Sequence, residues 1–135
     1  FTFVGTVNAV KYCDAIPHFV DIEENTLGIN VEKLEKYLNK IAQVKNNVCI
    51  NKLTGRKIKA VIPVHVFGHF MKINELTKLA KKFNLLVIED AAEAIGSYFK
   101  RKHASIIIHL LICNIMILVK IKSWPIHMIN PCIGI

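Results

Sequence analysis

The stretch that decides the fold is an apolar run that ends in two acidic residues, Leu85-Leu86-Val87-Ile88-Glu89-Asp90. A short, unbroken apolar run is typical of a strand that is covered on both faces, as in a parallel sheet. Its polar end places Glu89 and Asp90 at the carboxyl end of the predicted strand. Because ligands of open α/β sheets bind beyond the carboxyl ends of the strands, we expect the chemistry of the protein in this region.

The segments immediately before this run alternate between strand and helix patterns. Ile58–Val66 is rich in β-branched residues, which predicts a strand that delivers His65 near its end. A helix is predicted after it, because apolar residues recur on one helical face. Asn84 follows this helix and tolerates the left-handed conformation of a C-cap. The residues of the apolar face are Ile73, Leu76, Ala80 and Phe83.

Two further helices are predicted nearer the N-terminus. Val31, Leu34, Leu38 and Ile41 share one helical face, and Asn30 is a good N-cap for that helix. The second of these helices is a short one over Gly5–Tyr12. Two short strands are predicted over Phe1–Val4 and Pro17–Ile22, and a long polar loop over 42–57. This order of strands and helices predicts an α/β protein built from parallel βαβ units.

The composition agrees with a globular domain and excludes several other classes. The chain has 135 residues, 53% of them hydrophobic and 21% charged, which excludes a disordered or low-complexity protein. The net charge of +8 does not indicate nucleic-acid binding, because the basic residues are scattered and often alternate with glutamates. The four cysteines have no close pairing, so neither a disulfide scaffold nor a metal site is predicted, and we expect reduced thiols in a cytoplasmic protein. These are Cys13, Cys49, Cys113 and Cys132.

The composition changes sharply near Ala104. All ten acids lie at or before Glu93, whereas residues 105–135 contain eleven isoleucines and no acid. Ile106–Val119 is shorter than the ~20 residues that a membrane-spanning helix needs. We therefore expect an atypical apolar tail, and a buried segment, a membrane-prone segment and a non-native, frameshifted sequence are all compatible with its pattern. Because the chain lacks an initial Met, we also expect an internal fragment of a longer protein.

Asp90 is the candidate with the clearest chemistry. A carboxylate at the end of a buried strand can pair with a protonated pyridine ring and make that ring a better electron sink. Acids in such positions also bind Mg²⁺ or ribose, or cap the next helix, so the residue alone does not decide between these roles.

Four ordered segments together resemble the DegT/DnrJ/StrS family of pyridoxal-phosphate-dependent sugar aminotransferases. They are Thr2–Val10, Pro17–Ile22, Ile62–Gly68 and Ile88–Glu93. The resemblance covers residues 1–104 and implies a three-layer αβα fold with a mainly parallel sheet, as a partial large domain of the fold-type I pyridoxal-phosphate transferases. Residues 105–135 fall outside it.

The resemblance implies a cofactor role for four residues. Asp90 matches the acid that pairs with the pyridine nitrogen, and Phe3 matches the aromatic residue that stacks on the ring. Glu93 stands where many members have Gln near the ring hydroxyl, and His65 follows the Pro-Val-His pattern and supports the pocket. From the residues themselves, Phe3 as an ordinary core residue and His65 as a satisfied structural histidine remain alternatives.

The catalytic lysine of the family has no identifiable counterpart here. Lys102-His103-Ala104 still fits the family pattern, but the lysine that forms the Schiff base should follow it in an aromatic-Ser-aromatic context. Lys120 lies near the expected distance between the wrong neighbours, so no catalytic residue is assigned. Thr6 and Asn8 open the first helix and are read as structural.

The implied activity is transamination of a nucleotide-linked keto-sugar to an amino-sugar with pyridoxal 5'-phosphate, and with glutamate as amino donor. This places the protein in the biosynthesis of surface polysaccharide or glycan precursors, as a homodimer when full length. We expect the fragment to be inactive alone. The alternatives are a non-catalytic α/β binding module and an inert remnant with a membrane-prone tail.

Overall fold

The computed structural model describes residues 2–94, 98–99 and 102–103. Its helices are α1 (Val4–Tyr12), α2 (Val31–Ile41), α3 (Ile73–Lys82) and the short 3₁₀ turn η1 (Val66–Gly68). Its strands are β1 (Ala42–Lys45), β2 (Val48–Asn51), β3 (Ala60–Val61), β4 (Leu86–Val87), β5 (Tyr98–Phe99) and β6 (Lys102–His103). The predicted apolar tail lies outside the described residues. Within them, no helix is long and apolar enough to cross a membrane.

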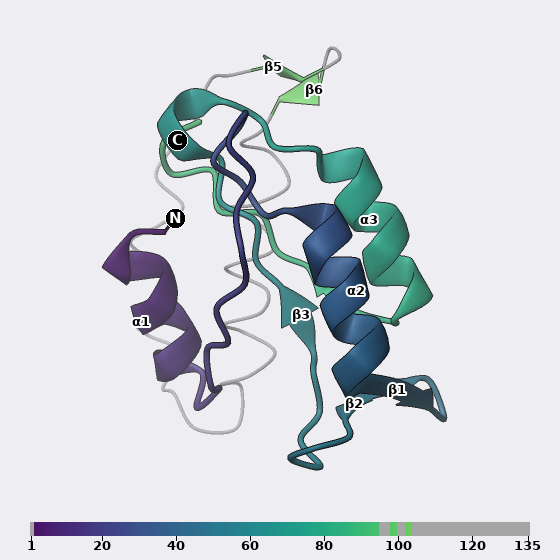
Figure 1. The fold of residues 1–135 in the computed structure, drawn as a ribbon. Coiled ribbons are helices and arrows are strands. Elements are labelled where there is room, and N and C mark those ends of the chain that lie inside the picture. The colour runs from purple at the N-terminus through teal and green to yellow at the C-terminus, as the bar shows by residue number, and fades with distance from the viewer. Residues whose placement is uncertain (1, 95–97, 100–101, 104–135) are drawn as a thin grey trace.

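The centre of the fold is the parallel pair of β3 and β4, joined through α3. Ala60 pairs with Leu86 and Val61 with Val87, and a parallel bridge continues the pairing from Val64 to Asp90. Figure 1 shows α1 on one side of β3 and both α2 and α3 on the other. The predicted α/β class and its βαβ unit are therefore confirmed.

The core lies between the parallel pair and helices α2 and α3. The apolar faces that the sequence predicted for these helices are buried there, and Leu76 is completely covered. Asn30 caps α2, because its side-chain oxygen accepts a hydrogen bond from the Lys33 amide at 3.0 Å. Asn84 follows α3 with a φ of 53°, the left-handed conformation that the sequence predicted. The buried residues of the two helices are Leu34, Leu38, Ile41, Ile73, Leu76, Leu79 and Ala80.

Two predicted strands are wrong. Helix α1 already begins at Val4, and Phe3 is an extended N-cap, so the expected strand over Phe1–Val4 does not form in the described residues. Pro17–Ile22 is an extended segment whose pairing is limited to one antiparallel bridge between Ile22 and Ile29. An extended segment becomes a strand only when a neighbour pairs with it, and sequence pattern does not reveal the neighbour.

The strands around the parallel pair are shorter than predicted. Within Ile58–Val66 only β3 is regular, since Pro63 has no amide hydrogen to contribute to a ladder. The run that leads to Asp90 forms β4 and was expected to be covered on both faces. Leu86 is instead 60% exposed. Coverage on both faces requires a packed layer on each side of the strand, and the described residues do not supply one over Leu86.

The predicted loop over 42–57 contains a β-hairpin. Strands β1 and β2 pair antiparallel from Ala42–Asn51 to Lys45–Val48. Asn46 and Asn47 join them with φ angles of 48° and 60°, and a two-residue turn of type I′ requires positive values at both positions. Asparagine is favoured both in loops and in this hairpin turn, so the polar segment by itself did not distinguish the two.

Candidate functional site

Two of the predicted site residues, Asp90 and His65, meet just beyond the ends of β3 and β4. The Asp90 amide donates a hydrogen bond to the Pro63 carbonyl oxygen at 2.8 Å, and the His65 amide donates to the Asp90 carbonyl oxygen at 3.0 Å. These two backbone bonds fix the end of one segment against the end of the other. The site therefore lies at the carboxyl edge of the parallel pair, where open α/β sheets bind ligands.

The Asp90 carboxylate is half-buried and held through both oxygens. The Thr6 hydroxyl donates to Oδ2 at 2.5 Å, and the Ala92 amide lies 3.2 Å from Oδ1. A carboxylate oxygen accepts more than one hydrogen bond, so each oxygen keeps capacity for a ligand donor.

The His65 side chain is completely buried beside Asp90. Its Nε2 lies 2.9 Å from Glu89 Oε2, and its ring packs on Phe70 with 4.6 Å between ring centroids. Which of the two groups donates in this contact depends on the tautomer of the ring. The Nδ1 atom of His65 has no hydrogen-bond partner in the described part of the chain. His65 is thus neither a fully satisfied structural histidine nor an exposed one.

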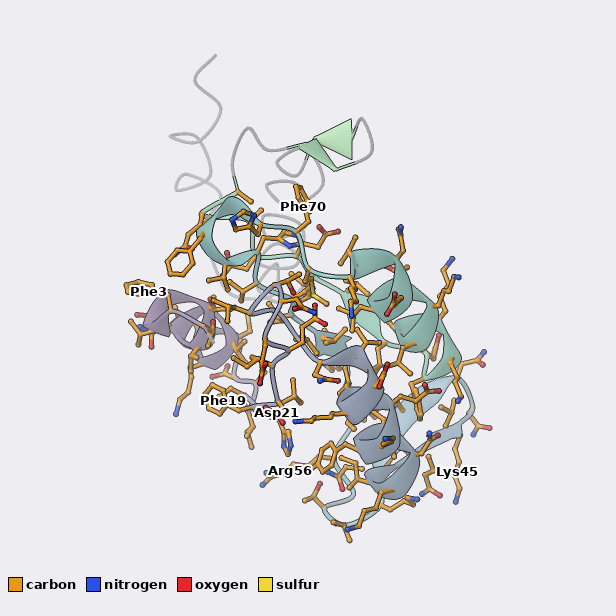
Figure 2. The ribbon with its side chains drawn as sticks, turned by 45° about the horizontal axis from the view of Figure 1, so that its top comes forward. Phe3, Phe19, Asp21, Lys45, Arg56 and Phe70 are labelled. Carbon is orange, nitrogen blue, oxygen red and sulfur yellow. The ribbon has the colours of Figure 1, made fainter. Side chains whose placement is uncertain are left out.

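The Phe3 ring stands at the N-terminal end of α1, at the edge of the molecule (Figure 2). It is 74% exposed, so the interpretation of Phe3 as an ordinary core residue is wrong. The Thr6 amide donates to the Phe3 carbonyl oxygen at 3.2 Å, which closes the first turn of the helix. This turn carries the exposed ring at one end and the hydroxyl that contacts Asp90 at the other.

Glu93 contacts the backbone of the turn that follows His65. Its Oε2 accepts a hydrogen bond from the Phe67 amide at 2.6 Å. Phe67 has a φ of 52°, a left-handed conformation that costs a non-glycine residue about 1–2 kcal/mol, and this bond supports it. The structure therefore assigns the Glu93 carboxylate a contact within the protein, and its predicted place near a ring hydroxyl stays a prediction.

The donor and acceptor set suits a planar cofactor with a protonated ring nitrogen. Asp90 offers an oriented carboxyl group, Phe3 an exposed aromatic face and His65 a buried ring nitrogen without a hydrogen-bond partner in the described residues. Residues 2–94, with the two short strands after them, contain no group of three side chains arranged to hold a metal ion. The arrangement can orient a ring and stabilise positive charge on it.

Other predicted groups contribute little to this site. Burial raises the pKa of the Cys49 thiol, which opposes formation of the reactive thiolate, as expected for a structural cysteine. Lys120 lies outside the described residues.

Three contacts of the site were missed from the sequence: the bond of Thr6 to Asp90, the pairing of Glu89 with His65 and the packing of Phe70. The sequence pattern gave no signal for the bond between Thr6 and Asp90, which are 84 positions apart. Glu89 precedes Asp90 in the quoted run, so pairing of the two strands was enough to bring it near His65. Nothing in the sequence pattern pointed to Phe70.

A sequence model of the DegT/DnrJ/EryC1/StrS aminotransferase family matches residues 1–107. A solved DegT/DnrJ/EryC1/StrS aminotransferase from Brucella abortus superposes with a TM-score of 0.57 at 34% identity, over 71% of this chain and 23% of the other.

Curated relatives match the same part of the chain. GDP-perosamine synthase of Escherichia coli O157:H7 is 38% identical over 102 residues, which are 76% of this chain and 24% of that protein. EpsN of Bacillus subtilis (strain 168), provisionally named a pyridoxal phosphate-dependent aminotransferase, is 36% identical over 104 residues, which are 77% of this chain and 24% of its own. The chain spans about a quarter of the length of these relatives.

Proposed function

This chain belongs to the DegT/DnrJ/EryC1/StrS aminotransferase family, and from that premise we propose that it is the cofactor-binding part of a sugar aminotransferase. The enzyme transfers an amino group from glutamate to a nucleotide-linked keto-sugar and uses pyridoxal 5'-phosphate. It works in the cytoplasm on precursors of surface polysaccharide, as a homodimer of full-length chains. The residues Asp90, Phe3, Glu93 and His65 belong to its cofactor site.

The names of the relatives support this substrate class. The Escherichia coli relative is a synthase of GDP-perosamine, a nucleotide-linked amino-sugar. A similar enzyme from Caulobacter vibrioides has the same name and is 34% identical to this chain over 101 residues. We carry over the class of reaction and leave the individual sugar open.

One observation carries the proposal: the Asp90 carboxylate lies at the carboxyl end of β4, beside the end of Pro63-Val64-His65 and against the helix that begins after Phe3. When bound, pyridoxal phosphate supplies a protonated ring that draws electrons from the substrate carbon. Asp90 would accept the hydrogen bond from the ring N–H, and Phe3 would offer an aromatic face for stacking on the ring. His65 Nδ1 would form a hydrogen bond with a ligand or water, and Glu93 holds the turn beside it.

The chain alone lacks much of the enzyme, and we propose that it binds the cofactor without turnover. The chain spans about a quarter of its curated relatives. No lysine stands in the family context after Lys102-His103-Ala104, so the amine that moves the substrate proton is not assigned. We further propose that residues 1–104 are the part that binds the cofactor and that the atypical apolar residues 105–135 do not belong to this unit.

Titration of the 135-residue chain with pyridoxal phosphate tests the cofactor site. Induced circular dichroism in the absorption band of the cofactor reports binding. We expect Asp90→Asn to weaken binding by roughly tenfold or more, because a neutral amide replaces the anion that pairs with the ring nitrogen. Asp21→Asn is the matched control, since it makes the same change at an exposed position. Equal affinity of the Asp90→Asn and Asp21→Asn variants would contradict the assignment.

A second measurement tests the absence of turnover. The chain with pyridoxal phosphate is mixed with GDP-perosamine, and the cofactor is analysed for its aminated form. We expect none to accumulate above the level without protein. Accumulation would show that an amine in this chain suffices for the reaction.

A further inference from the structure

The hydrogen bond from Thr6 to Asp90 joins residues that are 84 positions apart. Its 2.5 Å length is typical of a hydroxyl that donates to an ionised carboxylate. Within the part of the chain that the structure describes, it is the side-chain hydrogen bond that ties α1 to the rest of the molecule. Helix α1 has no fully buried residue, and Val7 and Val10 are only partly buried, so apolar packing holds it less firmly than it holds α2 and α3.

The backbone of Asp90 is already fixed without this bond. Its amide and carbonyl are paired with Pro63 and His65 across the ends of the parallel strands. These backbone bonds do not fix the rotation of the Asp90 side chain. The Ala92 amide restrains Oδ1 at 3.2 Å, whereas Thr6 restrains Oδ2 at the shorter distance of 2.5 Å. Thr6 therefore makes the closer of the two contacts that orient the carboxylate.

The position of Thr6 in the helix suits this task. The branched Cβ of a threonine in a helix leaves its hydroxyl few orientations. Thr6 is also three residues from Phe3 and donates its amide to the Phe3 carbonyl oxygen. One helical turn thus connects the exposed ring of Phe3 to the oxygen of Asp90.

We propose that Thr6 is a positioning residue that holds the Asp90 carboxylate at a set orientation relative to Phe3. The inference rests on the proposed function, because it gives the orientation a purpose: the ring N–H of a pyridine cofactor meets an acceptor that is already aligned. Thr6 acts through Asp90 and does not contact the cofactor.

The first test uses the 135-residue chain and pyridoxal phosphate as the probe. Thr6→Val keeps the shape of the side chain and removes the hydroxyl, whereas Thr6→Ser keeps the hydroxyl. We expect Thr6→Val to raise the dissociation constant about tenfold, and Thr6→Ser to stay within about twofold of the wild type. Asn8→Ala, at an exposed position of the same helix, is expected to bind as the wild type does. Unchanged affinity of Thr6→Val would overturn the inference.

The second test needs no cofactor. Thermal unfolding is measured for Thr6→Val, Asp90→Asn and the double variant. If Thr6 acts through Asp90, the double variant loses no more than the larger single loss, since both changes remove the same bond. Additive losses would overturn the inference and leave the proposed function standing. The proposed function fails separately if the wild-type chain does not bind pyridoxal phosphate while the unfolding losses of Thr6→Val and Asp90→Asn are still coupled. In that case the bond between Thr6 and Asp90 stands, but the purpose assigned to it does not.

Discussion

The environment of Asp90 is assembled from three separate segments. Its backbone pairs with the end of the Pro63-Val64-His65 segment, and its side chain meets Thr6 of α1. The Asp90 carboxylate is oriented by hydrogen-bond donors on both of its oxygens. The entropy lost by fixing its side chain is therefore lost on folding and not on ligand binding. This is the arrangement that a binding site needs when an acceptor must face a ligand donor in one direction.

Glu23 provides a separate test of charge at the residue scale. Its side chain is only 10% exposed, its Oε2 lies 2.8 Å from Lys72 Nζ, and its Oε1 accepts a hydrogen bond from the Thr26 hydroxyl at 2.7 Å. The hydrogen bond with Lys72, followed by that with Thr26, holds the pKa of the Glu23 carboxyl below its ordinary value.

We expect the Glu23 contacts to stabilise the fold at neutral pH and to be lost in acid. A carboxyl whose pKa is lower in the folded than in the unfolded chain contributes stability above its unfolded pKa, and loses it as the pH falls through the folded pKa. Glu23→Gln should therefore lower stability by about 1 kcal/mol at pH 7. The difference from the wild type should shrink below the ordinary carboxyl range of about pH 4.

Thermal unfolding as a function of pH measures this effect. Glu24→Gln is the control, because it makes the same change at an exposed neighbouring position. A difference between wild type and Glu23→Gln that stays constant from pH 7 to acid would show that the charge of Glu23 is not what stabilises the fold.

At the scale of elements, the helices differ in how much they depend on their surroundings. Helix α2 has a side-chain cap at Asn30 and three buried residues, and α3 has four buried residues and a left-handed residue after its end. Both follow the 3.6-residue period of an amphipathic helix. Helix α1 has neither a side-chain cap bond nor a buried residue.

The β1–β2 hairpin depends on the conformation of its turn. Asn47 has a φ of 60°, and its carbonyl oxygen accepts a hydrogen bond from the Asn84 side chain. We expect Asn47→Ala to lower the free energy of unfolding by about 1 kcal/mol, because a Cβ opposes the left-handed conformation more strongly when no polar side chain compensates. Asn47→Gly should retain stability, since glycine adopts this conformation freely.

Chemical unfolding measures the free energy of unfolding of both variants. Each variant removes the same side-chain amide, so the difference between them reports the cost of the positive φ at this position. If the glycine variant loses as much stability as the alanine variant, the positive φ is not what the turn requires of this residue.

Within the part of the chain that the structure describes, burial differs between the helices. The side with α2 and α3 contains the main core, whereas α1 and the segment after it carry exposed large apolar residues. Monomeric proteins rarely leave such residues close together without a role in contacts. The residues concerned are Phe3, Val4, Tyr12, Ile16 and Phe19.

Hydrogen exchange should show this asymmetry directly. We expect the backbone amides of α1 to exchange earlier than those of α3, because α1 opens without exposing a buried apolar side chain. Mass spectrometry of peptides over Val4–Tyr12 and Ile73–Lys82 measures the two rates in one sample. Equal protection of the two helices would show that α1 is held by more than its bond to Asp90.

The amino-acid sequence by itself determined the α/β class, helices α2 and α3 with their Asn30 and Asn84 ends, and the family to which the chain belongs. These features depend on interactions within a few residues, or on the order of motifs along the chain, and both are visible in one dimension. The carboxyl end of the final apolar run could also be named as the place of the site, because the edge of a parallel sheet follows from the strand order.

Only the tertiary structure decided which segments become strands and which side chains meet. The bond of Thr6 to Asp90, the pairing of His65 with Glu89 and the hold of Glu93 on Phe67 all join residues at least 24 positions apart. Such contacts exist only after distant segments have been brought together against the loss of chain entropy, and many alternative pairings share the same local pattern. The physical reason is that local preference acts within a turn, whereas the site is made of contacts that packing alone selects.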